Sequence, residues 1–90
     1  MRFTVVVERL AQDHFRTLVK SGDNASLKKL NKILDELEIH PKMGTGKPEQ
    51  LKYQLSGFWS RRINKKDHII YQIFEEPDNL VVVVSALGHY

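Results

Sequence analysis

The sequence predicts an α+β fold of order β-α-α-β-β-β-β, in which one antiparallel, twisted sheet carries two N-terminal helices on one face. Two observations predict it: apolar residues recur at helical spacing between residues 8 and 37, and the period changes to two from Leu51 onward. The chain has 90 residues, 41% hydrophobic and 28% charged, which is ordinary for a globular protein. We therefore expect residues 1–90 to form a single domain.

The chain begins with a predicted strand and a predicted helix. Residues 2–7 (RFTVVV) are rich in β-branched side chains, which favour a strand. Residues 8–20 (ERLAQDHFRTLVK) have apolar positions near helical spacing, and Gly22 follows them as a helix-ending residue.

A second helix and a loop follow. Asp23 or Asn24 can cap this helix. Its apolar residues form one stripe, made of Leu27, Leu30, Ile33, Leu34 and Leu37. Pro41 disfavours helix at the residue before it, and residues 42–48 (KMGTGKP) predict a loop rich in Gly and Pro.

Four short strands are predicted in the C-terminal half. They are residues 51–55 (LKYQL), 59–65 (WSRRINK), 68–76 (HIIYQIFEE) and 80–87 (LVVVVSAL). The last is apolar on both faces, so we expect it to lie inside the sheet rather than at an edge.

Alternation along residues 59–65 assigns side chains to the two faces of the sheet. Ser60, Arg62 and Asn64 fall on one face, whereas Trp59, Arg61 and Ile63 fall on the other. We expect Arg62 to point to the face that the helices leave uncovered. Phe58 and Trp59 begin this strand, and for both a core position is favoured over a base-stacking role.

The composition excludes several classes of protein. The absence of cysteine excludes disulfide scaffolds, thiol nucleophiles and zinc–thiolate sites. No apolar run is long enough for a signal peptide or a membrane span. We expect a cytoplasmic protein that does not bind membranes.

Positive charge is concentrated in residues 42–66, hereafter the basic segment. It carries seven Lys or Arg and one acid, Glu49, whereas the rest of the chain carries seven bases and ten acids. Such a segment indicates a phosphate backbone or an acidic partner. A solvated strand face explains the charge equally well.

The residues are compatible with metal-free cleavage of RNA. Metal-binding, Walker-loop and serine-hydrolase motifs are absent from the sequence, but RNA supplies its own nucleophile, the 2′-OH, and needs only a base, an acid and cations. Glu49 is a candidate base, His89 a candidate acid, and Tyr90 can stack on a base or bond a phosphate. The alternative is a loop glutamate and a frayed chain end. His14 and His40 are assigned no function.

Three parts of the sequence together resemble one family. They are GKPEQLKYQLSGFWSRRI (residues 46–63), the IIY of residues 69–71 and the terminal His-Tyr. They resemble the YoeB/Txe branch of the RelE-type bacterial toxins. The resemblance implies a RelE-like fold, one toxin domain over residues 1–90, no cofactor and no metal. It also implies a type II toxin that enters the ribosomal A site and cuts mRNA through the 2′-OH.

The resemblance also implies roles for individual residues. Glu49 would be the general base, His89 the general acid, and Tyr90 would orient the substrate. Lys52 and Arg62 would hold phosphate and stabilise the developing charge. From the same segment we add Lys47 and Arg61 as candidate substrate-binding residues.

One position departs from the family pattern. His68 stands where the family usually has an arginine that is counted among its catalytic residues. A histidine is mostly neutral at pH 7 and cannot grip phosphate as a guanidinium does. Losing a cation from such a site costs on the order of 10²–10³ in rate. Three explanations stay open: a slower enzyme, an enzyme whose rate rises at lower pH, or a substitution that weakens the toxin so that it can be produced.

The family implies four partners. They are mRNA in the ribosomal A site, a second toxin copy in a homodimer, a YefM- or Phd-like antitoxin with an acidic C-terminal segment, and operator DNA reached only through the antitoxin complex. Two alternatives to the nuclease stay open. One is a catalytically weakened homologue that acts mainly as antitoxin-binding partner and operator co-repressor, and the other is a general RNA-binding module.

Overall fold

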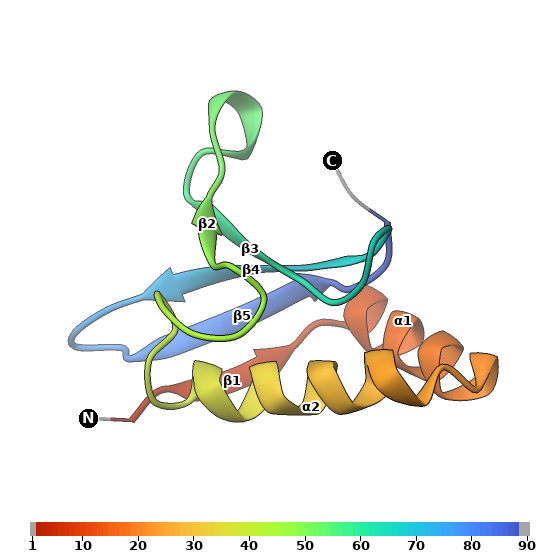
Figure 1. Ribbon diagram of the computed structural model, residues 1–90. Coiled ribbons are helices and arrows are strands. Elements are labelled where there is room, and N and C mark those ends of the chain that lie inside the picture. The colour runs from red at the N-terminus through yellow and green to blue at the C-terminus, as the bar shows by residue number, and fades with distance from the viewer. Residues whose placement is uncertain (1, 89–90) are drawn as a thin grey trace.

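The computed structural model describes residues 2–88 and confirms the α+β class (Figure 1). Its elements are β1 (Thr4–Val7), α1 (Arg9–Ser21), α2 (Asn24–Leu37), β2 (Glu49–Gln50), the 3₁₀ helix η1 (Tyr53–Leu55), β3 (Phe58–Arg62), β4 (His68–Phe74) and β5 (Leu80–Ser85). Within residues 2–88, no helix is both long and apolar enough to cross a membrane.

The five strands form one sheet in the order β1-β5-β4-β3-β2. The β2–β3, β3–β4 and β4–β5 pairs are antiparallel, but β1 runs parallel to β5, with Thr4 opposite Leu80 and Val7 opposite Val83. The prediction of a wholly antiparallel sheet is therefore wrong for β1. This strand is followed by two helices rather than a hairpin turn, so no local turn fixes its direction. The apolar β5 has a neighbour on each side, as predicted.

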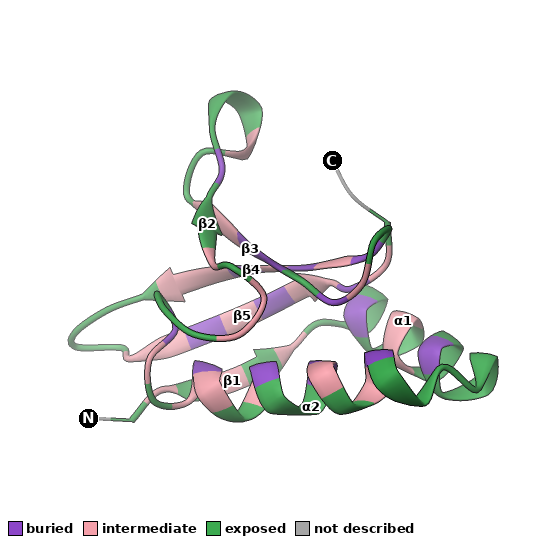
Figure 2. Ribbon diagram, in the orientation of Figure 1, coloured by how far each residue is buried: buried purple, intermediate pink, exposed green. Residues whose placement is uncertain are grey.

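Both helices lie against one face of the sheet, and the core fills the space between them (Figures 1 and 2). The buried apolar residues come from the predicted helical stripes and from alternate strand positions: Ala11, Leu18, Leu30, Ile33, Leu37, Ile63, Ile69, Tyr71, Val81, Val83 and Ala86. Figure 2 shows the buried positions of the helices turned toward the strands. Neither α1 nor α2 covers the opposite side of the sheet, hereafter the open face.

The predicted helix boundaries between α1 and α2 are confirmed. Gly22 adopts the left-handed conformation (φ 75°), which glycine reaches without steric cost, and donates its N–H to the Val19 carbonyl. Asp23 caps α2 by accepting bonds from the backbone N–H of Ser26 (3.1 Å) and from its hydroxyl (2.6 Å). These bonds lower the pKa of Asp23 from its ordinary value.

The predicted strand over residues 51–55 is wrong. Gln50 and Trp59 are the last paired residues of β2 and β3, and one further hydrogen bond joins the Leu51 N–H to the Phe58 carbonyl. Because β3 begins at Phe58, the residues just before it offer no opposing strand, and the chain turns into η1 instead. Tyr53 starts that turn with φ 59° and is 88% exposed. The turn projects from the sheet on the side away from the helices (Figure 1).

Candidate active site

Strand pairing brings three of the candidate residues onto the open face. Residues opposite each other in an antiparallel pair share a face. Glu49 lies opposite Ser60, and Arg62 lies opposite His68. Arg61, between Ser60 and Arg62, is buried on the helix side, so its neighbours point the other way. The predicted facing of Arg62 is therefore confirmed, and Glu49, Arg62 and His68 share the open face.

The candidate base and cations are accessible and closely spaced. Ser60 and Arg62 are two residues apart on one strand, which separates their Cα atoms by roughly 6.6 Å, and Glu49 is the partner of Ser60. Lys47, Glu49, Lys52 and Arg62 are all exposed. The Arg62 N–H donates to the Gly46 carbonyl (2.7 Å), so the loop before Glu49 crosses directly beside Arg62.

The chain end is attached to the same part of the sheet as far as Gly88. The candidate residues His89 and Tyr90 lie outside the described residues. Gly88 accepts a bond from the N–H of His68 (2.9 Å) and donates its own N–H to the carboxylate of Asp67 (2.8 Å). Since His68 is the partner of Arg62, Gly88 is held at the end of the sheet that carries Arg62.

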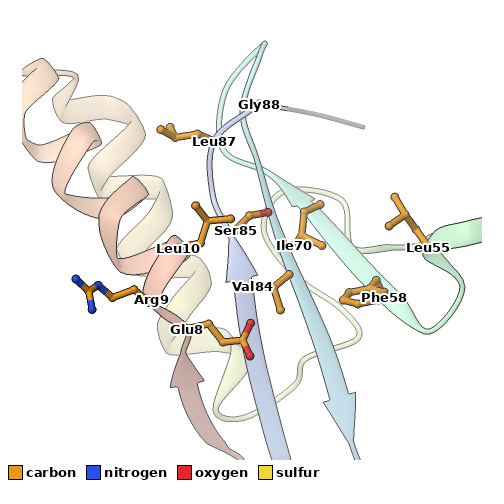
Figure 3. A pocket seen from close by; sticks show the side chains of 10 residues that line it. All are labelled: Glu8, Arg9, Leu10, Leu55, Phe58, Ile70, Val84, Ser85, Leu87 and Gly88. Atoms are coloured by element: carbon orange, nitrogen blue, oxygen red, sulfur yellow. The ribbon is translucent and has the colours of Figure 1, made fainter.

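A pocket of about 770 Å³ adjoins these residues. Its floor and walls come from open-face side chains of three strands together with η1 and the start of α1 (Figure 3): Glu8, Arg9, Leu10, Leu55, Phe58, Ile70, Val84, Ser85, Leu87 and Gly88. The expectation of a core position is confirmed for Trp59, which packs against the core. It is wrong for Phe58, which lines this pocket.

Arg61 does not belong to the site. Its side chain is 0% exposed. It donates hydrogen bonds to the Tyr71 hydroxyl (3.0 Å), to Glu36 (2.6 Å) and to the carbonyls of His40 (2.9 Å) and Met43 (2.8 Å). The structure contradicts the predicted substrate-binding role, because the guanidinium is buried and bonded within the protein.

The ion pair of Arg61 with Glu36 anchors the loop that precedes β2. Glu36 also accepts bonds from the N–H (2.8 Å) and hydroxyl (2.7 Å) of Thr45. Burial alone would raise the pKa of Glu36, but the bonds from Thr45 and Arg61 outweigh it and lower the pKa below its ordinary value. Sequence reasoning missed Glu36, because a single acid on a helix carries no signal for a partner 25 positions away.

Gly46 allows this loop to pass close to β3. Its φ is +86°, and a Cβ there would lie 2.7 Å from the Arg62 carbonyl oxygen. Only glycine combines this positive φ with the absence of a Cβ. Gly46 therefore allows the backbone of residues 47–49 to pass close to Arg62.

Comparison with known proteins assigns the family. Residues 8–90 match the model of the YoeB-like toxin of bacterial type II toxin–antitoxin systems. The chain belongs to this family. Toxin YoeB of Escherichia coli (strain CFT073) is 38% identical over 68 residues, which is 76% of this chain and 77% of that toxin. The expected resemblance to the YoeB branch is confirmed.

Solved YoeB structures share the fold over 98% or more of this chain. The YoeB/ParE toxin of Agrobacterium tumefaciens superposes with a TM-score of 0.85 at 26% identity, covering 98% of this chain and all of that one. The YoeB dimer of Staphylococcus aureus gives a TM-score of 0.81 at 30% identity with both chains fully covered. The same S. aureus toxin is also known in a heterotetrameric complex with YefM (TM-score 0.79, 30% identity, both chains fully covered). These likenesses confirm the RelE-like fold class.

Proposed function

We propose that this YoeB-family toxin is a ribosome-dependent, metal-free mRNA endoribonuclease. The observation that carries the proposal is the open face itself. There the only acid of the basic segment, Glu49, shares a surface with Arg62 and His68, and the chain is anchored beside them at Gly88.

The proposed reaction uses the nucleophile of the RNA. Glu49 takes the proton of the 2′-OH, and the 2′-oxygen forms a bond to the phosphorus. The bond from phosphorus to the 5′-oxygen breaks, and His89 gives that oxygen a proton. The products are a 2′,3′-cyclic phosphate and a 5′-OH. Arg62 and Lys52 stabilise the charge that develops on the phosphorane.

Other residues of the open face bind the substrate. Lys47 and Lys52 contact phosphates, and Tyr90 orients the scissile nucleotide. Phe58 and the apolar pocket next to Gly88 offer a surface for the base of a flanking nucleotide. His68 stands opposite Arg62, so a positive charge at this position would act on the same phosphate.

The proposed partners follow from the site and the relatives. The substrate is mRNA in the ribosomal A site, in the cytoplasm. By analogy with the S. aureus toxin, a second toxin copy and a YefM-like antitoxin with an acidic C-terminal segment bind this chain, and operator DNA is bound only through that complex. The acidic segment would meet the same cations that bind RNA.

The test is cleavage of mRNA on programmed ribosomes. Glu49→Gln and His89→Ala should each lower the single-turnover rate by about 10²–10⁴-fold. Glu76→Gln, an exposed acid outside the basic segment, is the matched control and should stay within about twofold of the parent. Undiminished cleavage in both Glu49→Gln and His89→Ala would refute the assigned roles.

One observation favours a second candidate function. His68 occupies the position of the family arginine, which suits a weakened toxin that mainly binds antitoxin and represses its operon. Expression without antitoxin separates the two functions. Growth arrest supports the nuclease, whereas normal growth that becomes arrest with His68→Arg supports the binder.

A further inference from the structure

We propose that Asp67 is a positioning residue that holds Gly88 beside the candidate active site. The inference rests on the proposed function, because Gly88 directly precedes the proposed acid, His89, in the sequence. Asp67 would not touch the substrate and would act through the backbone of Gly88.

Asp67 is the only buried carboxylate among residues 2–88, at 4% exposure. One of its oxygens accepts the Gly88 N–H at 2.8 Å. The N–H of the next residue, His68, donates to the Gly88 carbonyl at 2.9 Å. Gly88 is therefore held through both its donor and its acceptor by two consecutive residues.

The carboxylate is itself fixed in place. Its second oxygen accepts a bond from the side-chain amide of Asn64 at 3.0 Å. The Asn64 amide oxygen accepts the N–H of Lys66 and of Asp67, and its nitrogen also reaches the Ser26 hydroxyl in α2 at 2.9 Å. The β3–β4 turn and the helix layer thus form a rigid support for the bond to Gly88.

A second side chain holds the residues just before Gly88. His14 of α1 accepts the N–H groups of Ala86 (3.0 Å) and Leu87 (3.2 Å) through Nδ1. Three consecutive backbone N–H groups therefore donate to side chains rather than to another strand. This arrangement ends β5 and ties the chain to Asp67 in the β3–β4 turn and to His68 at the start of β4.

His89, the proposed acid, directly follows Gly88 in the sequence, so a bond that fixes Gly88 acts on the neighbour of that residue. A misplacement of about 1 Å in a catalytic group can cost about 10²-fold in rate. A bond from an amide to a charged carboxylate is shorter and stronger than a neutral one. A buried carboxylate is therefore well suited to position the acid without contacting the RNA.

The experiment compares Asp67→Ala with Ser26→Ala in the complete toxin on programmed ribosomes. Ser26→Ala breaks the far end of the same network but leaves the bond to Gly88. We expect Asp67→Ala to lower the single-turnover rate by about 10²-fold with ribosome affinity within about threefold. Ser26→Ala, assayed below its unfolding temperature, should keep the rate within about threefold. Fast hydrogen exchange of the Gly88 amide is expected in Asp67→Ala alone.

A swap of the two side chains provides the rescue. The Asp67 carboxylate accepts one bond from the Gly88 N–H and one from the Asn64 amide NH₂. In Asp67→Asn, one of the two acceptors becomes an NH₂ group, so one of these donors faces another donor. Adding Asn64→Asp removes the clash, because the amide oxygen introduced at position 67 can accept from Gly88 and the carboxylate introduced at position 64 can accept from the introduced NH₂. We expect the single substitution to be slow and the double substitution to recover within about fivefold of the parent. If Asp67→Ala does not fold, the comparison of Asp67→Asn with the double variant tests the positioning role instead.

The outcomes separate the two proposals. If His89→Ala is inactive but Asp67→Ala cleaves at the parent rate, the positioning role is overturned and the nuclease stands. A folded double variant that stays as slow as Asp67→Ala also overturns it. If His89→Ala and Asp67→Ala both cleave normally, the proposed function itself falls.

Discussion

Two consecutive arginines have opposite environments in this toxin. Arg61 is fully buried and bonded to Glu36, Tyr71 and loop carbonyls, whereas Arg62 is exposed on the open face. Strand alternation predicts that the two side chains lie on opposite faces of the sheet, and the structure confirms this. It cannot predict that the inward arginine finds a carboxylate, because that partner comes from a distant helix.

The pair predicts a clean separation of stability from activity. Arg61→Ala should lower the free energy of unfolding by about 3–5 kcal/mol, because Glu36 loses its buried counter-charge. Arg62→Ala should change it by less than about 0.5 kcal/mol but slow cleavage by about 10²-fold. Urea unfolding and single-turnover cleavage measure the two effects. An Arg61→Ala protein as stable as the parent would contradict the anchoring role.

His68 gives a second prediction at this scale. His68→Arg places a permanent cation opposite Arg62 on the open face. We expect the single-turnover rate at pH 7 to rise by about 10-fold or more, with unchanged products. The parent toxin is the control, and a rate that falls or stays level would show that this position does not act on the phosphate.

At the scale of elements, the loop between α2 and β2 decides where the candidate base lies. The composition of residues 42–48 predicts a loop, and the structure confirms it. The sequence does not reveal that Thr45 and Arg61 both bind Glu36, since each contact joins residues far apart in the chain. The same limit explains the wrong strand over residues 51–55, where alternation is present but a pairing partner is not.

Alanine substitutions at two glycines test whether this loop passes close to β3. Gly46 and Gly57 both have positive φ, but a Cβ at Gly46 would meet the Arg62 carbonyl at 2.7 Å, and a Cβ at Gly57 would meet nothing within 4 Å. Gly57→Ala should cost about 1 kcal/mol. Gly46→Ala should cost about 3 kcal/mol and also slow cleavage. Equal losses of stability, measured by urea unfolding, would count against the close approach.

The Glu36 cluster also predicts a dependence of stability on pH. The pKa of Glu36 is lowered on folding from its ordinary value of 4.5. The unfolded chain therefore binds more protons in this range, and the stability from Glu36 is present above pH 4.5 and lost as pH falls through the folded pKa.

Urea unfolding of the parent and of Glu36→Gln, from about pH 6 to pH 3, checks this sign. The parent should lose stability more steeply than Glu36→Gln below about pH 4.5. Asp23, whose pKa is also lowered, leaves a residual slope in both proteins. Parallel curves would mean that Glu36 is not ionised and bonded in the folded state.

At the scale of the whole molecule, the helices and core occupy one side of the sheet and the candidate chemistry the other. The periodicities of the sequence predict this division, because a helix layer on one face leaves the other face open. They do not predict that β1 pairs in parallel with β5 or that Asp67 and His14 hold residues 86–88. Those contacts join residues at least 21 positions apart in the sequence, where no local pattern applies.

The most direct test of cleavage through the 2′-OH removes this nucleophile from the substrate. Programmed ribosomes would carry an mRNA with a single 2′-deoxy nucleotide at the scissile position in the A site, beside an all-ribose control. We expect the toxin to cut the control, leaving a 2′,3′-cyclic phosphate, and cleavage at the 2′-deoxy position to disappear. Cleavage of the 2′-deoxy linkage at the control rate would contradict this expectation.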